Sequence, residues 1–231
     1  MLLAVDTATR FASIALYDGS GVIAEESWRS DNNHSREVLP SISDMLARQG
    51  LGPDDLTAVA VAIGPGSFTG LRIGLSIAKG LCLALGIPII AIPTLDITTY
   101  AVGDPGGPVV AVLEAGRGRI CVASYHFEEG LPVQDGQASV VKVSEWDAQL
   151  IDAVLVAGEI GPDVAERLLD QGGCESVAIS SLAGSVRRAG YLAELAWDRL
   201  EQGRVEDLDS LSPIYTHYPS PTAAHLAAKH T

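Results

Sequence analysis

A glycine-rich loop between two apolar stretches has the clearest capacity for chemistry in this chain. It reads Gly64-Pro-Gly-Ser-Phe-Thr-Gly70, follows the small-apolar run 58–63 and precedes the apolar segment 71–85. An unbroken apolar run is typical of a strand buried on both faces, and the longer segment, which stops at Gly86, predicts a helix. Free N–H groups at a helix N-terminus attract anions, so a strand, a glycine loop and a helix in this order could bind phosphate.

The spacing of the glycines departs from the known phosphate-binding motifs. Gly64 and Gly70 are too far apart for a Walker A loop, which also needs Gly-Lys-Ser/Thr where Leu71 and Arg72 follow. A dinucleotide-binding fingerprint would need a glycine at Thr69. A turn that lets the helix pack closely against its strand is therefore at least as good an interpretation.

The other residues with reactive side chains stand apart from one another. Asp6, Thr7 and Thr9 form a polar turn after the apolar run 2–5, and His34 lies near the start of a predicted helix, where a capping or surface role is the simpler interpretation. No Ser/His/Asp set, matched carboxylate pair or metal-ligand spacing is recognisable in the sequence. The three cysteines are widely spaced and predict buried thiols in a reducing cytosol; they are Cys82, Cys121 and Cys174.

Composition sets the class of protein. The 231 residues allow one large or two small domains, and 47% hydrophobic residues are ample for a core. The formal net charge of −14 disfavours tight unaided binding of nucleic acid, because an acidic surface repels phosphates. Charged residues interrupt the N-terminus, and Lys79 and Pro88 interrupt the apolar region 73–92, so we expect no secretory signal or membrane span and a cytoplasmic location.

Periodicity and turn signals predict an α/β chain. Three antiparallel strands begin it, a parallel strand–helix–strand unit follows, and the segment 103–108 (GDPGGP) is the best domain boundary. The predicted strands are 2–5, 11–17, 22–28, 58–63, 87–92, 109–113, 120–125, 154–157 and 177–179. The predicted helices are 35–49, 71–85, a short one from 94, one opened by Ser144-Glu-Trp-Asp147, 162–170 and 182–202.

The predicted helix 71–85 is almost wholly apolar. Arg72, Ser76 and Lys79 form one narrow polar stripe. The small residues Gly70, Gly74 and Ala78 recur every four positions, which permits a close helix–helix approach. A helix of this kind must be covered on most sides. It is either a core helix or a helix shared between the core and a protein partner.

Three motifs identify a family. The block Ile63-Gly-Pro-Gly-Ser-Phe-Thr-Gly-Leu-Arg-Ile-Gly-Leu-Ser-Ile-Ala-Lys-Gly-Leu81 closely resembles the TsaB family of bacterial tRNA threonylcarbamoyladenosine biosynthesis proteins. Ala4-Val-Asp-Thr-Ala-Thr9 and His34-Ser-Arg-Glu-Val-Leu-Pro40 resemble the same family. The resemblance covers roughly residues 1–127 and, beyond them, Leu211-Ser-Pro-Ile-Tyr215.

The resemblance implies both a fold and a function. The fold would be α/β with two actin-like ATPase (ribonuclease H-like) lobes: a first lobe over 1–103, and a smaller, degenerate lobe with an irregular tail over 104–231. The function would be that of a non-catalytic subunit, required for N6-threonylcarbamoyladenosine at position 37 of tRNAs reading A-starting codons. It would bind and activate the threonylcarbamoyl transferase. Thr94 and Thr98 stand where that transferase has metal-binding histidines, and hydroxyls cannot replace imidazoles at such a site.

The resemblance also implies partners and contact residues. The partners would be the transferase, the small ATPase subunit of its complex, a second copy of this chain, and tRNA only through the complex. The implied interface residues are His34, Arg36, Leu39, Leu71, Arg72, Leu75 and Lys79. The chain would have no cofactor or metal of its own; an adenine nucleotide at the heteromeric interface would contact Asp6, Thr7, Gly66 and Ser67. The alternatives are a stand-alone actin-like or sugar-kinase-like ATPase and a purely self-associating structural protein.

Overall fold

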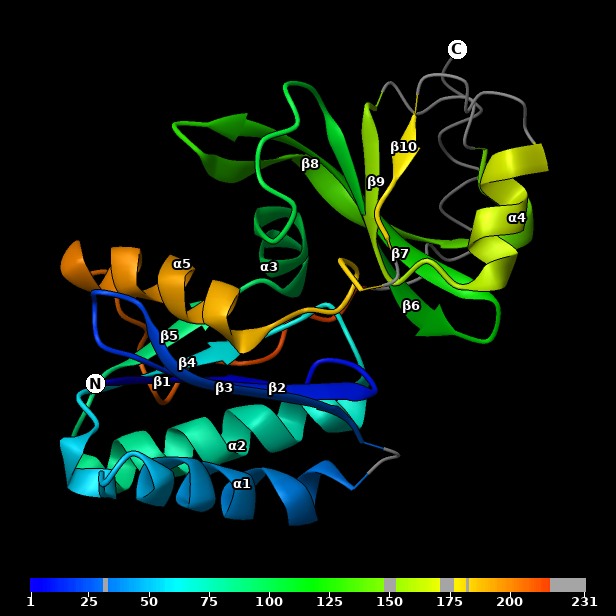
Figure 1. Cartoon of the computed structure of the whole chain (residues 1–231). Coiled ribbons are helices and arrows are strands. Elements are labelled where there is room, and N and C mark those ends of the chain that lie inside the picture. Colours follow the sequence, from blue (N-terminus) through cyan, green and yellow to red (C-terminus); the bar gives the residue numbers. More distant parts are fainter. Residues whose placement is uncertain (31–32, 148–152, 171–176, 182, 217–231) are drawn as a thin grey trace.

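Two mixed sheets, each with five described strands, form the framework of the protein (Figure 1). The structure is a computed structural model that describes residues 1–30, 33–147, 153–170, 177–181 and 183–216. The strands of the first sheet are β1 (Leu2–Asp6), β2 (Phe11–Tyr17), β3 (Val22–Arg29), β4 (Ala58–Ala62) and β5 (Ile89–Ile92). Those of the second are β6 (Val109–Gly116), β7 (Arg119–Glu128), β8 (Leu131–Lys142), β9 (Leu155–Gly158) and β10 (Ala178–Ile179).

The two sheets repeat one topology. The strand order is β3-β2-β1-β4-β5 in the first sheet and β10-β9-β6-β7-β8 in the second. In each, the first strand has antiparallel neighbours on one side and parallel neighbours on the other. This repeat confirms the predicted α/β fold with two similar lobes of the actin-like ATPase type.

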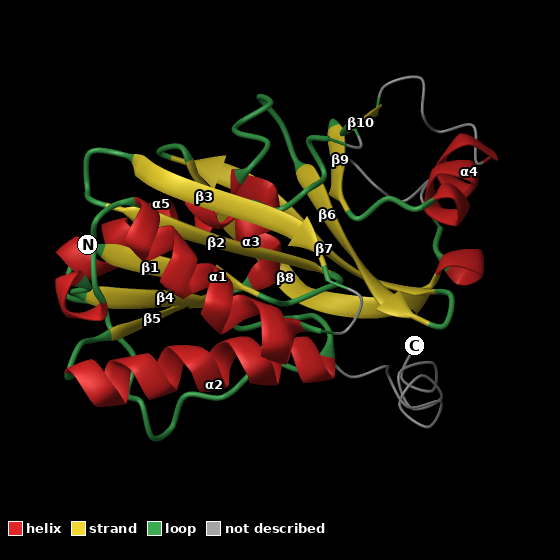
Figure 2. Cartoon of the chain, turned by 60° about the horizontal axis from the view of Figure 1, so that its bottom comes forward, coloured by secondary structure: helices red, strands yellow, loops and turns green. Residues whose placement is uncertain are grey.

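Helices cover both faces of the first sheet. α1 (His34–Arg48) and α2 (Phe68–Leu85) lie side by side on one face, and α5 (Ala189–Glu201) lies on the other (Figures 1 and 2). Successive residues of a strand point to opposite faces, so β1 contributes side chains to the hydrophobic clusters on both faces of the sheet. Leu3 and Val5 are buried in a cluster with α1, whereas Leu2 and Ala4 are buried against α5.

Two helices cross from one lobe to the other. α3 (Thr94–Tyr100) follows the first sheet in sequence but packs against β6, β8 and β9, and α5 follows the second sheet but packs against β1 and β2. The predicted division into 1–103 and 104–231 follows the order of the two sheets along the chain, while each of these two helices covers the sheet of the other part. The sequence could not reveal the exchange, because an apolar helix face does not say which sheet it covers.

The second sheet is also covered on both faces. Leu95 of α3 packs on one face with Val109 and Leu113, and α4 (Pro162–Asp170) packs on the other through Val164 and Leu168. Three local predictions differ from the structure. β8 is an unpredicted long strand, α5 begins at Ala189 rather than at 182, and the helix predicted at 144–147 is a 3₁₀ turn, Val143–Glu145.

α2 is a core helix of the first lobe. It is the one described helix that is long and apolar enough to cross a membrane by length and composition. Its side chains Leu71, Ala78 and Cys82 are buried against the first sheet, and Gly86 ends it in the left-handed conformation. The apolar composition of α2 is therefore explained by its packing against the first sheet.

Candidate functional site

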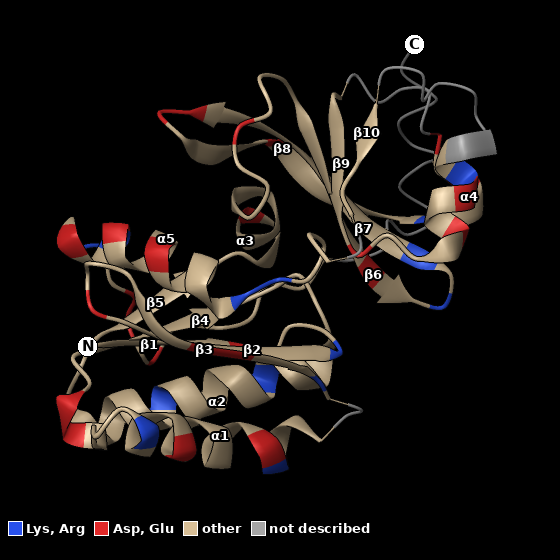
Figure 3. Cartoon of the chain, viewed as in Figure 1, with Lys and Arg blue, Asp and Glu red and all other residues tan. Residues whose placement is uncertain are grey.

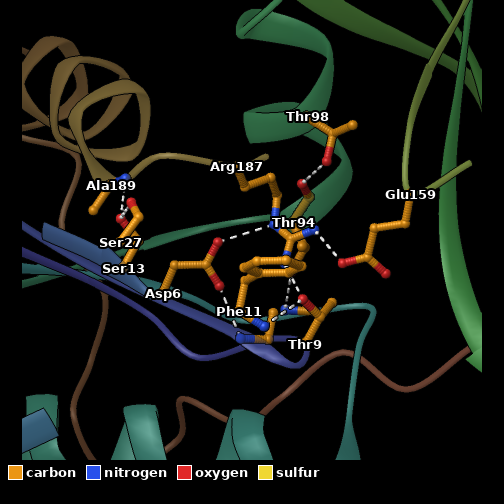
Figure 4. Close-up of polar contacts among 12 residues, drawn as sticks. Asp6, Thr9, Phe11, Ser13, Ser27, Thr94, Thr98, Glu159, Arg187 and Ala189 are labelled. Atoms are coloured by element: carbon orange, nitrogen blue, oxygen red, sulfur yellow. Dashed lines mark hydrogen bonds and ion pairs between the residues drawn. The ribbon is translucent and has the colours of Figure 1, made fainter. Parts of the chain in front are cut away.

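A buried arginine joins the two lobes at the end of β1 (Figure 4). Arg187 lies directly before α5. Its Nε donates a hydrogen bond to Asp6 Oδ2 at 3.0 Å, its Nη1 to Glu159 Oε1 at 3.1 Å and its Nη2 to Thr9 Oγ1 at 2.8 Å. Asp6 ends β1 in the first sheet, and Glu159 follows β9 in the second. One guanidinium thus connects carboxylates from both lobes.

This network is almost completely removed from water. The side chains of Arg187 and Asp6 are 3% and 2% exposed, and that of Glu159 is 19% exposed. Burial acts to lower the pKa of Arg187, but the charges of Asp6 and Glu159 outweigh it and leave the pKa raised. The other oxygen of Asp6 accepts the N–H of Ala8 at 2.8 Å. A nucleotide–metal complex that sought Asp6 would therefore have to displace Arg187.

Close packing accounts for the glycines of the 64–70 loop. A Cβ at Gly66, Gly70 or Gly74 would come within 2.1 to 2.3 Å of an oxygen of Thr7 or Ala8. The β1–β2 turn therefore lies directly against the start of α2, and only glycine permits this approach. The loop is a tight packing turn, as interpreted, but the element it admits is the β1–β2 turn rather than the strand before the helix.

The start of α2 is also capped by its own loop. Ser67 Oγ accepts the N–H of Gly70 at 3.3 Å, and the N–H of Ser67 donates to the carbonyl of Ala8 at 2.6 Å. The hydroxyl of Thr7 donates to the carbonyl of Gly70 at 2.8 Å. Thr7, Gly66 and Ser67, three of the four residues predicted to contact a nucleotide, thus pack or bond within the protein.

The two threonines at the expected histidine positions are buried and hydrogen-bonded. Thr94 Oγ1 accepts the N–H of Gly64 at 3.0 Å, and Thr98 Oγ1 donates to the carbonyl of Thr94 at 3.0 Å. Both hydroxyls therefore hold the start of α3. In the described part of the chain, no three or more His, Cys, Asp and Glu side chains gather in a way that could hold a metal ion.

Three of the predicted interface residues belong to the core and need correction. Leu71, Leu75 and His34 are 0%, 6% and 4% exposed. Positions spaced by three and four share one side of a helix, and in α2 this side faces the sheet. An apolar pattern alone could not distinguish that side from a partner-binding side.

The outer face of α1 and α2 carries the remaining predicted contacts. Arg36, Leu39 and Arg72 are exposed and Lys79 is half-buried. Leu39 is 48% exposed, and the unpredicted Leu83 is 79% exposed. We define the outer face as Arg36, Leu39, Arg72 and Leu83.

His34 is buried at the start of α1 with one nitrogen unsatisfied. Its Nε2 is the one buried side-chain nitrogen or oxygen of the described residues that has no hydrogen-bond partner. Burial lowers the pKa of His34, and this effect exceeds the opposite effect of the Thr9 backbone, Glu37 and Asp6. Burial therefore favours the neutral form of His34, which belongs to the packing of the first lobe.

An aromatic and cationic cluster lies at the start of α2. The rings of Phe68 and Tyr215 stack with centroids 5.3 Å apart, and the Arg72 guanidinium lies 3.8 Å from the centre of the Phe68 ring. Arg72 Nε donates to the hydroxyl of Tyr215 at 3.0 Å. The C-terminal segment reaches this place because the N–H of Ile214 donates to the carbonyl of Ile63 at 2.7 Å. The resemblance motif 211–215 thus docks beside the glycine loop.

A cleft of about 930 Å³ opens between the lobes in front of the Arg187 network. Its floor includes Thr9, Glu159 and Arg187, and its walls come from the β6–β7 turn, the glycine loop and the 214–216 segment. Cys121 lies in its wall with a pKa raised by burial. The cleft occupies the junction where the two sheets meet.

Sequence reasoning missed Arg187 and Glu159. Glu159 stands directly after a predicted apolar strand, as Asp6 does after β1, and this parallel was the available signal. Arg187 had no such signal, because the segment was expected to be helical and its partners lie far away in sequence.

The repeated sheets and the inter-lobe cleft define a two-lobed α/β protein of the actin-like ATPase class. A family model described as TsaD, tRNA N6-adenosine threonylcarbamoyltransferase, matches residues 12–154. The chain therefore belongs to this family.

Individual relatives point to one branch of the family. The chain is 34% identical over 145 residues to the tRNA threonylcarbamoyladenosine biosynthesis protein TsaB of Bacillus subtilis. The aligned region covers 63% of each chain. It is 35% identical over 130 residues to the protein of the same name from Escherichia coli, covering 55% of this chain and 56% of the relative. The match thus spans somewhat over half the length of these curated relatives.

A solved structure extends the likeness to nearly the whole chain. A Pseudomonas aeruginosa protein, described as uncharacterized with similarity to peptidase YeaZ, superposes with a TM-score of 0.78 and 27% identity. The superposition covers 94% of this chain and 99% of that one. The chain is thus TsaB-like in sequence and in fold, which confirms the resemblance stated from the motifs.

Proposed function

We propose that this chain is a non-catalytic subunit required for N6-threonylcarbamoyladenosine formation at position 37 of tRNAs that read A-starting codons. The observation that carries the proposal is its membership in the transferase family combined with Thr94 and Thr98 at the expected histidine positions. Both hydroxyls are used inside the protein, so α3 keeps its structural role without ligands suited to a transition metal.

The chain acts by binding the threonylcarbamoyl transferase through the outer face. Leu39 and Leu83 are the exposed apolar side chains there, and covering one leucine contributes roughly 2 kcal/mol. Arg36 and Arg72 add charge at the rim. A second copy of this chain would use the same surface, so self-association and partner binding compete.

Activation requires that the chain binds the active arrangement of the transferase more tightly than the inactive one. The small ATPase subunit and the tRNA reach this chain through the same cytoplasmic complex. In this proposal the chain has no metal or nucleotide of its own.

The contacts of Asp6 argue against the stand-alone ATPase. Arg187 holds its carboxylate, and the glycine loop is filled by the β1–β2 turn. An adenine nucleotide at the heteromeric interface that used Asp6 would need Arg187 to move away first.

Co-sedimentation of the purified chain with the transferase tests the proposal. Leu83→Glu and Arg72→Glu should both stay folded by circular dichroism, because the side chains are exposed, and both should lose the complex. Arg204→Glu, exposed and outside the outer face, is the matched control. A wild-type chain that never binds the transferase, or outer-face variants that bind like the control, would overturn the proposal.

A further inference from the structure

We propose that the mouth of the inter-lobe cleft contacts the phosphates and unstacked bases of a single-stranded RNA loop. This inference rests on the proposed function and names the part of the tRNA that the chain touches inside the complex: its anticodon loop. The argument has three steps, which concern the closed floor of the cleft, its charge and its exposed rings.

The floor of the cleft is closed to a nucleotide phosphate. Arg187 there is 3% exposed and already donates to Asp6, Glu159 and Thr9. The carboxylate of Asp6 behind it repels anions, and the glycine loop leaves no space for a phosphate against the β1–β2 turn. A ligand of this cleft must therefore be bound at its mouth.

The mouth is positively charged on a strongly acidic protein. Away from the floor, the described lining contains three arginines and two carboxylates, although the whole chain has a net charge of −14. The arginines are Arg10, Arg29 and Arg119, and the carboxylates are Glu114 and Asp163. Figure 3 shows basic positions at the end of β2 and β3, on α2 and around the β6–β7 turn, while acidic positions gather on α5.

These arginines come from both sides of the opening. Arg10 and Arg29 belong to the first lobe and Arg119 to the second. Arg10 forms an ion pair with Glu114 across the opening and still exposes 59% of its side chain. A polyanion that lies across the mouth, such as an RNA backbone, would therefore contact cations from both lobes.

Exposed aromatic rings stand among these arginines. Phe68 is 56%, Phe11 is 38% and Tyr215 is 36% exposed, and all three line the cleft. Phe68 and Tyr215 stack on each other, and Arg72 contacts both side chains and fixes their position. Aromatic platforms within a basic groove bind unpaired bases by stacking, and this combination favours single-stranded RNA over a duplex or an acidic peptide.

The test measures binding of a fluorescent anticodon stem-loop RNA to the complex of this chain with the transferase. The variant Arg29→Gln/Arg119→Gln removes two cations from the mouth. The control Arg48→Gln/Arg204→Gln removes two exposed cations elsewhere and leaves the same net charge. Each lost phosphate contact should weaken binding about 5-fold at 0.1 M salt, and the slope of log K against log salt should fall by about 1.4 for the pair.

Phe68→Ala tests the stacking surface separately. It should weaken RNA binding by about 5- to 100-fold with little change in the salt slope, because a ring carries no charge. In the modification reaction, the variants at the mouth should raise KM for tRNA and leave kcat unchanged. Co-sedimentation with the transferase should be retained by all of them.

The outcomes separate this inference from the proposed function. Mouth variants that match the control in affinity, salt slope and KM, in a reaction that still requires this chain, would overturn the RNA contact alone. A duplex RNA or ATP that competes as well as the stem-loop would also overturn it. A reaction that proceeds without this chain would instead overturn the proposed function.

Discussion

Replacing Arg187 by methionine tests the role of the buried network that joins the lobes. The change removes one buried guanidinium and leaves Asp6, 2% exposed, without its cation. Loss of one partner from a buried ion pair costs roughly 3–5 kcal/mol, because the remaining charge stays desolvated. A domain with a total stability of about 5–15 kcal/mol would lose a large part of it.

The neighbouring arginine supplies a matched control. Arg188 pairs with Glu25 but is 55% exposed, so Arg188→Met should cost about 1 kcal/mol or less. Urea unfolding followed by circular dichroism compares the two variants. Adding Asp6→Asn to Arg187→Met should recover part of the loss, since it removes the unpaired charge. Equal unfolding midpoints for Arg187→Met and Arg188→Met would refute the reasoning.

Three further predictions concern packing, pH and chemistry. Gly70→Ala should destabilise the protein by about 1–3 kcal/mol, because its Cβ would come 2.1 Å from the carbonyl oxygen of Thr7. Gly80→Ala on the same helix has open space around it and should stabilise the protein by about 0.5–1 kcal/mol. Urea midpoints decide both, and equal shifts would contradict the packing account. Burial lowers the pKa of His34 in the folded protein, so the unfolded chain binds a proton at a higher pH than the folded one. The free energy of unfolding should therefore decrease as the pH falls below about 6.5. His34→Leu should flatten this part of the pH–stability curve, and an unchanged curve would show that His34 does not cause the loss. The isolated chain should hydrolyse ATP no faster than a denatured control; turnover that Asp6→Ala abolishes would restore the ATPase alternative.

Much of the fold was predictable because the strands and helices carry strong local signals. The run 58–63 and the segment 71–85 are apolar and bounded by glycine and proline, and β4 and α2 form there. β8 was missed because Pro132 and Gly136 interrupt its pattern, and its pairing with β7 is irregular. Whether an element forms could be predicted, whereas which lobe α3 and α5 cover is decided by tertiary packing.

The candidate site was less predictable for the same reason. Asp6 was singled out from its place after a buried strand, but its partner Arg187 is distant in sequence and no local pattern links the two. The stripe of small residues in α2 was expected to serve a close helix–helix approach, but the element that approaches Gly70 and Gly74 is the β1–β2 turn. Leu71 and Leu75 show the limit of an apolar pattern, which identifies a covered face but not what covers it.

Reconstitution of the tRNA modification tests the central claim most directly. Single-turnover formation of N6-threonylcarbamoyladenosine on an unmodified tRNA is measured with the purified transferase system while this chain is titrated in. The account predicts that activity rises and saturates as the complex forms, and that Leu83→Glu shifts the titration in proportion to its loss of partner binding. Full activity with the chain left out, or equal stimulation by Leu83→Glu at the same concentrations, would contradict it.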